Sequence, residues 1–400
     1  MHSKSDVVVV GSGPSGSFSA LTAAKMGVEV IVCEEHEEIG LPSHCPGHIS
    51  IKGLKRLGLH LPARVVENEI SGVVFYSPSG KDFRVRLACP VTYVINRAMF
   101  DKHLAQIAED AGAKFLLGTR VESLLSDKGF VRGVSLRSGE NLISKMVIDA
   151  EGCASTFLKQ AGLQTFDRSL VVNAVNCEVD HVDDVQEDVV EVYLGQKYAP
   201  GFFAWIIPRR NGSAKIGLAT RIGNAREYLK HFLNVHPVAR RKLRSILVKN
   251  PSYHLIPLGG PIAKTYHNGF LAVGDAASQV KPTTGGGIIM GLTCGKIAAE
   301  TACQALQQDD FSESFLSKYQ QRWQHAIGFD MSVMKRIRLM LNRLSDQRLD
   351  EIISLCSQWH LSESLQKVRD IDFQGKSLIH LLKSPNTWVV AFYSFLASMM

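Results

Sequence analysis

The sequence lacks the features that mark membrane-spanning, metal-binding and disulfide-linked proteins. No two of its eight cysteines form a C-x-x-C pair, and their spacing fits neither a zinc site nor a disulfide framework. The longest apolar run, residues 388–400, is shorter than the ~20 residues that span a bilayer as a helix. A strand pattern begins almost at Met1, which leaves no room for a signal peptide. These absences predict a reducing, cytoplasmic location and no metal site.

The sequence also lacks a large excess of charge of either sign. The net charge is only +7 over 400 residues and is spread along the chain, so nucleic-acid binding is not expected. One basic segment, residues 331–348, predicts an amphipathic helix. Its apolar side is Val333, Met334, Ile337, Leu341 and Leu344, and its basic side is Lys335, Arg336, Arg338 and Arg343. Such a helix either packs on the core or docks on anionic lipid, and the apolar run 388–400 leaves the same two alternatives.

A βαβ unit opens the chain. Residues 7–10 are four consecutive valines, typical of a strand buried on both faces. A helix rich in alanine follows and ends near Gly27, and residues 28–33 predict a second strand with Glu34 at its tip. The crossover should be right-handed and the sheet parallel.

The turn between strand and helix carries the motif G-x-G-x-x-G. Gly11 permits the tight turn, Gly13 lets the backbone approach a pyrophosphate, and Gly16 allows close packing of helix on strand. The free N–H groups at the helix start attract phosphate. Glu34 is placed to accept hydrogen bonds from ribose hydroxyls. The motif therefore predicts a dinucleotide site.

Later segments indicate which dinucleotide binds. Residues 269–277 read as a strand that ends at Gly274-Asp275, and a glycine-rich helix start follows at residues 283–287. A carboxylate here can bind ribityl hydroxyls, and the helix start can hold anionic flavin oxygens. Residues 149–155 read D-A-E-G-C-A-S at the end of another strand, and Arg97 precedes a predicted helix at 100–111.

These pieces, in this order, resemble the FAD-dependent reductases and hydroxylases of the para-hydroxybenzoate hydroxylase superfamily, with Glu151 in place of the usual Asp. Within it, the chain is most similar to the geranylgeranyl reductases, including the archaeal digeranylgeranylglycerophospholipid reductases. Residues 200–208 (PGFFAWIIP) resemble the family's Y-x-W-x-F-P segment of the substrate cavity, with Phe203 for Tyr and Ile207 for Phe. The loop 44–48 (HCPGH) is similar to the cysteine-and-glycine loop that archaeal members place near the flavin.

The motifs and this resemblance together predict the site residues. Cys45 is the candidate proton donor, and Phe203, Trp205, Ile207 and Pro208 are expected to contact the substrate. The expected FAD contacts are Gly11, Gly13, Pro14, Ser15, Gly16, Glu34, Cys45, Gly47, Arg97, Glu151, Gly152, Gly274, Asp275, Pro282, Gly285, Gly286 and Gly287.

The predicted fold class is α/β, with a Rossmann-like FAD-binding domain, an inserted β-sheet substrate domain and a C-terminal helical segment. The FAD-binding domain is expected at residues 1–70, 94–165 and 263–330. Substrate-domain strands are expected at 71–93 and 166–262, and the helical segment at 331–400. Asn211-Gly212 is the strongest hairpin signal in the chain.

The resemblance implies reduction of carbon–carbon double bonds in geranylgeranyl chains, on archaeal-type ether lipids, by hydride from reduced FAD. The chain carries no second strand-anchored G-x-G-x-x-G, so the electron donor stays open between NAD(P)H, a ferredoxin and another small reductant. Expected partners are a prenylated lipid and a peripheral membrane contact. Three alternatives remain: an aromatic hydroxylase or halogenase, a quinone-linked electron-transfer flavoprotein, and a prenyl-binding carrier without catalysis.

Overall fold

A computed structural model describes residues 3–180, 182–244, 251–366 and 370–381. The chain forms two compact units, each built from three segments. The first unit comprises Met1–Ser43, Arg97–Arg168 and Gly259–Met331, and the second comprises His44–Asn96, Ser169–Leu258 and Ser332–Met400. The predicted apolar run at 388–400 lies outside the described residues.

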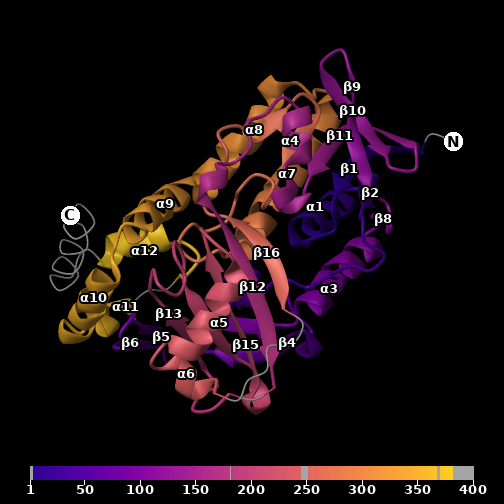
Figure 1. The fold of residues 1–400 in the computed structure, drawn as a ribbon. Helices are drawn as coiled ribbons and strands as arrows, with labels where there is room; N and C mark the ends of the chain where they lie inside the picture. Colours follow the sequence, from indigo (N-terminus) through magenta and orange to yellow (C-terminus); the bar gives the residue numbers. More distant parts are fainter. Residues whose placement is uncertain (1–2, 181, 245–250, 367–369, 382–400) are drawn as a thin grey trace. The chain divides into compact units, whose positions relative to one another are not determined.

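The first unit is built on an eight-stranded sheet with the order β17-β18-β11-β1-β2-β8, and β10 and β9 extend it from β11 (Figure 1). Strands β18, β11, β1, β2 and β8 run parallel. The chain leaves β1 toward β2 on one side and toward β11 on the other, which creates the switch point where open α/β sheets bind ligands. The strands are β1 (Ser3–Val10), β2 (Val30–Cys33), β8 (Lys114–Leu116), β9 (Val121–Asp127), β10 (Phe130–Leu136), β11 (Asn141–Asp149), β17 (Tyr266–His267) and β18 (Phe270–Ala272).

Helices of the first unit pack through small residues. A Cβ atom on Gly291 of α7 would lie 2.2 Å from Ser15 Oγ, and one on Gly295 would lie 2.7 Å from Ser15 O. Glycine at both positions therefore lets α7 approach α1 closely (Figure 1). The helices are α1 (Pro14–Lys25), α3 (Arg97–Asp110), α4 (Thr156–Gln160), α7 (Ile288–Gln308), α8 (Glu313–Trp323) and the π-helical turn Gln324–Gly328.

The second unit contains a seven-stranded sheet with the order β16-β12-β15-β14-β13-β5-β6 and a three-stranded sheet β3-β7-β4. The large sheet is antiparallel except where β13 meets β5. Its strands are β5 (Gly72–Tyr76), β6 (Asp82–Arg86), β12 (Val171–Val179), β13 (Val189–Tyr193), β14 (Ala204–Pro208), β15 (Ala214–Thr220) and β16 (Ser252–Pro257). The small sheet is β3 (His48–Ser50), β4 (Val66–Ile70) and β7 (Thr92–Ile95).

Residues 44–70 were predicted to belong with the FAD-binding segments, and they group instead with the second unit. The reason is strand pairing, because β3 and β4 both pair with β7. Helix α2 (Ile51–Arg56) lies between these two strands in the sequence.

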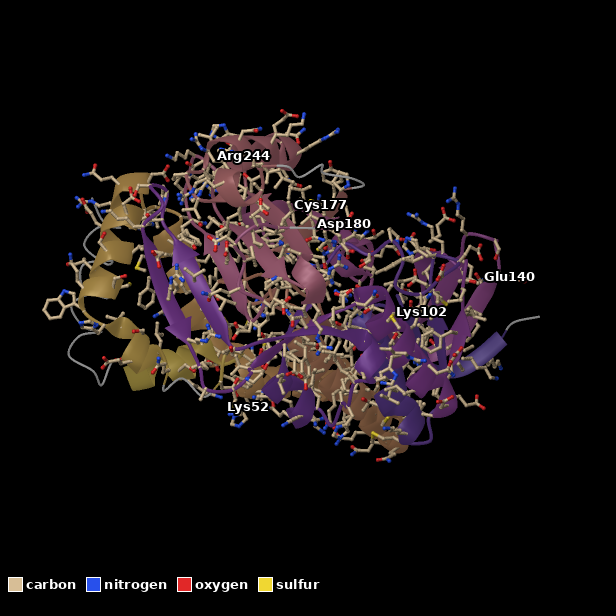
Figure 2. The ribbon with its side chains drawn as sticks, turned by 90° about the horizontal axis from the view of Figure 1, so that it is seen from below. Lys52, Lys102, Glu140, Cys177, Asp180 and Arg244 are labelled. Carbon is tan, nitrogen blue, oxygen red and sulfur yellow. The ribbon has the colours of Figure 1, made fainter. Side chains whose placement is uncertain are left out.

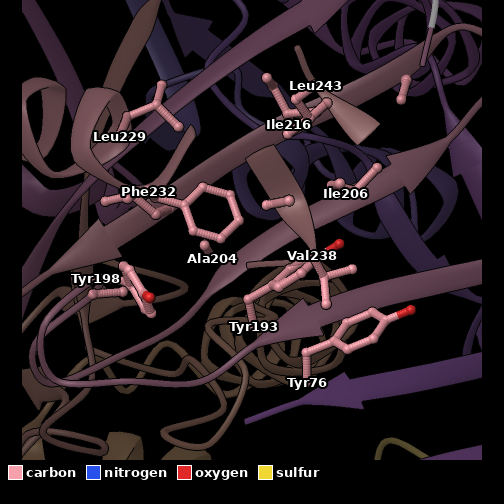
Figure 3. Packing of buried hydrophobic residues seen from close by; sticks show 14 of the residues in the cluster. Tyr76, Tyr193, Tyr198, Ala204, Ile206, Ile216, Leu229, Phe232, Val238 and Leu243 are labelled. Carbon is pink, nitrogen blue, oxygen red and sulfur yellow. The ribbon is translucent and has the colours of Figure 1, made fainter. Parts of the chain in front are cut away.

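One face of the large sheet is covered by α5 (Ala225–Val235) and α6 (Ala239–Lys242). Strand alternation turns Ala204 and Ile206 of β14 to this side, where they join a core that includes Tyr193 and Phe232 (Figure 3). The predicted turn at Asn211-Gly212 connects β14 to β15, as expected. The basic residues at the end of α6 differ in burial. Arg244 is exposed just after the helix (Figure 2), whereas Lys242 is buried against Glu191.

The C-terminal helices differ from the prediction in two ways. Helix α9 (Phe329–Leu341) stops before residue 348, and α10 (Asp346–Gln358) begins after Ser345, whose side chain caps it. Arg338, expected on the basic side, is buried, and its guanidinium lies 4.8 Å from the centre of the Phe202 ring. Burial lowers the pKa of Arg338 to about 10. Helices α11 (Leu361–Leu365) and α12 (Gln374–Leu381) follow.

Helices α10 and α11 pack with Phe83 and Val85 of β6, which places this part of the tail on the second unit. None of the helices in the described part of the chain is long and apolar enough to cross a bilayer.

Candidate functional site

The glycine-rich turn between β1 and α1 has two kinds of glycine. Gly11 has a positive φ, and a Cβ atom there would meet Ala150 O at 2.5 Å; on Gly16 it would meet Gly11 O at 2.0 Å. These two glycines are required by the protein's own packing. Gly13 is different, because nothing lies within 4 Å of its Cβ position. The open space beside Gly13 is what a closely approaching ligand needs.

Two helices begin at this edge with uncapped backbone N–H groups. Helix α1 starts with Pro14 after Gly13, and α7 starts after Gly287; neither has a side-chain cap or an acidic residue in its first turn. Neither helix therefore neutralises its own start, and the backbone N–H groups there can attract an anion. A Cβ atom on Gly274 would lie 2.4 Å from Ser15 Oγ, so the end of β18 also closes on the start of α1.

Glu34 is held rigidly at the tip of β2. Its Oε2 accepts from the N–H (2.9 Å) and the hydroxyl (2.7 Å) of Ser12, and its Oε1 accepts from the N–H of His36 (3.0 Å) and lies 2.6 Å from Nδ1. Burial alone would raise the pKa of Glu34, but these hydrogen bonds outweigh it and lower the pKa. The sequence prediction missed Ser12 and His36, although a hydroxyl between two motif glycines was an available signal.

The last residue of β11 carries a buried carboxyl group that the prediction did not select. Asp149 is fully buried, and its Oδ1 accepts from the N–H of Glu151 at 3.0 Å. Burial, followed by the neighbouring Glu151 charge, raises the pKa of Asp149 well above its usual value. Among the described residues, neither Asp149 Oδ2 nor the buried Ser155 Oγ has a hydrogen-bond partner. Two such polar atoms fit a site that a polar ligand completes.

The predicted contact Glu151 has a local role as well. Its Oε1 accepts from the N–H of Phe157 at 2.8 Å, which turns the carboxylate toward the start of α4. Burial raises the pKa of Glu151 against the lowering effect of this bond. Gly152 has a positive φ, and its Cβ position is open, as it is at Gly13.

Asp275 lies at the start of α7. A Cβ atom on Gly287 would lie 3.0 Å from Asp275 Oδ1, and the thiol of Cys153 donates to Oδ2 at 3.7 Å. The glycine-rich loop before α7 contains a turn, in which the N–H of Gly285 donates to Lys281 O at 2.9 Å. Pro282, within this turn, is buried. The DAEGCAS segment, Asp275 and the glycine-rich loop thus meet within one unit.

Arg97 is half-buried at the first position of α3. Its guanidinium makes two bonds to Asp101, Nε to Oδ1 at 3.2 Å and Nη2 to Oδ2 at 3.0 Å. Burial raises the pKa of Asp101 despite this ion pair. Asp101 therefore orients the arginine that the resemblance places against the cofactor.

In the second unit, the loop that carries Cys45 is anchored by its glycine. Gly47 has a positive φ, a Cβ atom on it would meet Ile95 O at 2.2 Å, and the N–H of Ile95 donates to Gly47 O at 2.8 Å. The N–H of Gly47 also donates to Cys45 Sγ at 3.4 Å. The thiol of Cys45 is half-buried.

Three of the four predicted substrate residues share one apolar face of the large sheet, called here the Trp205 face. Trp205 and Ile207 are buried on it, and Phe203 packs against Trp205 edge to face, with ring centres 6.2 Å apart. The Trp205 indole N–H donates to Asn176 Oδ1 at 3.4 Å. Pro208 pairs with Ala214 of the opposite face, so alternation separates it from the other three. The residues of the large sheet and its flanking loops on this face are Val172, Ala174, Val190, Phe202, Trp205, Ile207, Ala219 and Leu258, with Val192, Phe203 and Ile256 partly buried beside them; Ile70 and Val94 of the small sheet pack against them.

The first unit thus places an acid at one strand tip, two uncapped helix starts and an open glycine at the same end of the parallel strands. This arrangement fits a dinucleotide, and a family model described as an FAD binding domain matches residues 4–293. The fold and the site define an FAD-dependent oxidoreductase.

The comparisons with individual proteins narrow this class. The chain is 35% identical to the digeranylgeranylglycerophospholipid reductase of Methanocaldococcus jannaschii, over 87% of this chain and 89% of that protein. It is 33% identical to digeranylgeranylglycerophospholipid reductase 1 of Methanococcoides burtonii, over 96% and 92%. A crystal structure from Thermoplasma acidophilum, described as geranylgeranyl bacteriochlorophyll reductase-like, matches with a TM-score of 0.86 at 26% identity and covers 98% of this chain and 100% of that one. The chain belongs to the digeranylgeranylglycerophospholipid reductase family, which confirms the predicted family and cofactor.

Proposed function

We propose that this protein saturates carbon–carbon double bonds of geranylgeranyl chains carried by archaeal-type ether phospholipids. The observation that carries this proposal is identity of 30–35% with reductases of that name over most of the chain. The apolar Trp205 face supports it, because a prenyl chain offers only hydrocarbon to its binding site.

Bound FAD, once reduced, supplies the hydride for such a reduction. Gly13 and the starts of α1 and α7 would hold the phosphates and the anionic flavin oxygens, and Glu34 would accept from the ribose. An isolated alkene has no carbonyl group to polarise. The protein must therefore contribute alignment, exclusion of water and a proton.

We assign the alignment to the Trp205 face. Trp205 has an exposed fraction of 5% and Ile207 one of 4%, so neither has freedom to adapt to a different shape. The bond from the indole N–H to Asn176 fixes the plane of the Trp205 ring. A rigid aromatic wall of this kind favours one position of the prenyl chain.

We assign the proton to the thiol of Cys45. After it donates, the thiolate would keep its bond from the Gly47 N–H, which stabilises the negative charge. Cys45→Ala should leave FAD binding intact and slow reoxidation of reduced flavin by the lipid, since a positioned acid contributes ~10²–10⁴-fold. Cys45→Ser nearly keeps the volume but replaces the thiol with a weaker acid, so a purely steric role would leave this variant near wild type.

The test of the function is anaerobic. The purified protein is reduced with dithionite, and geranylgeranyl ether lipid is then added in excess. Flavin absorbance reports reoxidation, and mass spectrometry measures the mass of the lipid product. The proposal expects reoxidation and the gain of two hydrogens per reduced bond. If prenyl lipids did not reoxidise the reduced flavin, the reductase proposal would fail. Rapid reoxidation by a quinone would instead indicate a quinone-linked electron-transfer flavoprotein, and rapid reoxidation by oxygen with a phenol would indicate an aromatic hydroxylase.

For the electron donor we propose NAD(P)H, acting transiently at the flavin, or a ferredoxin. Anaerobic addition of each to the oxidised protein distinguishes them, because the physiological donor should bleach the flavin within the time of one turnover. Failure of both would overturn this proposal and leave the reductase assignment standing.

We further propose that the protein works at a membrane surface. Lys335, Arg336 and Arg343 are exposed on and just after α9, and Leu339 beside them has an exposed fraction of 39%. These side chains support binding to anionic headgroups, which salt should screen over about 10 Å at 0.1 M. Lys335→Glu with Arg336→Glu should abolish flotation with anionic vesicles. Lys128→Glu with Arg137→Glu, an equal change of charge at exposed positions of the first unit, should not; equal loss in both would contradict the proposal.

A further inference from the structure

The loop before α7 is folded around a lysine. The carbonyl of Lys281 accepts from the N–H groups of Gly285 (2.9 Å) and Thr284 (3.3 Å), and its own N–H donates to Gly286 O at 3.4 Å. A Cβ atom on Gly286 would lie 2.6 Å from Lys281 Cε and 3.2 Å from Nζ. The ammonium group therefore lies against the backbone immediately before the first turn of α7.

The charge of Lys281 adds to the positive end of the α7 helix dipole, beside which the carboxylate of Asp275 also lies, with Oδ1 3.0 Å from the Cβ position of Gly287. Helix α7 has 21 residues, and its first turn contains neither a side-chain cap nor an acidic residue. Its start carries the equivalent of roughly half a positive charge, and the ammonium adds a full one beside it. Lys281 is only half-buried, so a ligand at the helix start can approach its side chain.

We propose that Lys281 stabilises the negative charge that the flavin carries after two-electron reduction, and so sets the redox potential of the bound FAD. Reduction by two electrons with uptake of one proton leaves one negative charge at the pyrimidine end of the flavin ring, and a second proton cancels it. This inference rests on the assignment of the glycine-rich loop to the flavin. It does not require that the substrate is a prenyl lipid.

The size of the effect follows from the behaviour of ion pairs. An opposite charge within about 4–6 Å lowers the pKa of an acid by about one to three units. Removing the ammonium should therefore favour the neutral form of reduced FAD and weaken binding of the reduced cofactor about tenfold relative to the oxidised one. For a two-electron couple a tenfold change corresponds to about 30 mV.

The experiment compares Lys281→Met, which removes the charge at similar length, with Lys281→Arg, which keeps it. Lys296→Met is the matched control, because Lys296 lies further along α7, where its nearest carboxylate, on Glu300, is 4.0 Å away. Midpoint potentials of the FAD-loaded proteins are measured anaerobically by dye equilibration over a range of pH, without lipid. Lys281→Met should lower the midpoint potential by about 30 mV. It should also raise the pKa at which neutral, fully reduced FAD loses a proton to become the anion. Lys281→Arg and Lys296→Met should remain near wild type.

An unchanged potential in Lys281→Met, or an equal shift in Lys296→Met, would overturn the proposal. Should Lys281→Met purify without FAD, the affinities of the FAD-free protein for oxidised and for dithionite-reduced FAD replace the potential. A larger loss for reduced FAD supports the role of Lys281, and an equal loss overturns it. Because no lipid is present, a wrong substrate assignment cannot produce any of these results.

Discussion

The indole ring of Trp205 lies directly against the backbone of Gly217 on the neighbouring strand. The two residues pair in register between β14 and β15, and a Cβ atom on Gly217 would come within 2.6 Å of ring atom Cζ2. The same atom would come within 2.3 Å of Val175 O. Only glycine at this position leaves room for the ring where its N–H reaches Asn176.

Gly217→Ala should therefore displace the Trp205 ring. Overpacking of a core costs about 1–3 kcal/mol of unfolding free energy, and the moved ring should reduce turnover of the prenyl lipid more than FAD binding. Tryptophan fluorescence, urea unfolding and lipid-driven flavin reoxidation check these effects. Gly328→Ala is the control, because its nearest neighbour is a flexible Gln324 side chain at 3.5 Å. Unchanged turnover of the prenyl lipid in Gly217→Ala would show that the Trp205 ring does not position the substrate.

The glycines of the first turn should respond differently to substitution. Gly13→Val adds a side chain to open space, so the FAD-free protein should keep its stability while FAD occupancy falls severely. Gly16→Ala places a methyl group 2.0 Å from Gly11 O, so it should destabilise the protein even without FAD. Absorbance of bound flavin and thermal unfolding of the FAD-free proteins distinguish the two. Wild-type FAD occupancy in Gly13→Val would show that the pyrophosphate lies elsewhere.

The sequence was informative where a short segment determines its own structure. The valines of β1, the glycine motif and the Gly274-Asp275 turn each combine a strand end with a helix start, and parallel pairing brings such ends together. The prediction therefore found the segments that meet at one edge of the first sheet. Of the four residues that the motif resemblance predicted to contact the substrate, Trp205 and Ile207 lie on one face of β14 and Pro208 lies on the other.

The sequence was less informative where contacts depend on distant segments. Arg338 looks like a solvent-facing residue of a basic helix, but α9 packs so that its guanidinium covers Phe202. Residues 44–70 carry no local sign that β3 and β4 pair with β7. Lys215 sits within an apolar strand pattern, and its partner Glu67 is far away in the sequence. Tertiary packing decides all three cases.

Lys215, which is buried, and Glu67, which is half-buried, should behave as a coupled pair. Nζ of Lys215 lies 2.5 Å from Glu67 Oε2 and donates to Ile95 O at 2.9 Å, the same carbonyl against which Gly47 packs. Lys215→Met should cost about 3 kcal/mol of unfolding free energy, because it leaves a carboxylate without its closest cation. Adding Glu67→Leu should recover part of that loss, since it removes the carboxylate that Lys215 no longer neutralises. Urea unfolding of the two single variants and the double variant measures the coupling, and strictly additive losses would refute it.

The last prediction concerns the buried carboxyl group of Asp149 and the pH dependence of stability. Its pKa in the folded protein is raised, first by burial and then by the neighbouring Glu151 charge. In the unfolded chain an Asp loses its proton near pH ~3.9. Above that pH the folded protein holds more protons than the unfolded one, so stability is fully present below pH ~4 and falls as the pH rises toward the raised pKa.

Asp149→Asn should remove this dependence while keeping an oxygen that accepts from the Glu151 N–H. The FAD-free variant should be more stable than wild type at neutral and alkaline pH, and the advantage should vanish below pH ~4. Glu151→Gln should reduce the same dependence by a smaller amount, because its charge is the second cause of the shift. Glu34→Gln is the opposing control: hydrogen bonds from Ser12 and His36 lower the pKa of Glu34 against the effect of burial, so its loss should destabilise the FAD-free protein at neutral pH and matter less as the pH falls. Urea unfolding of the three FAD-free variants across this pH range is the measurement. If Asp149→Asn destabilised the protein equally at every pH, the carboxyl group would instead be making a bond that the amide cannot replace.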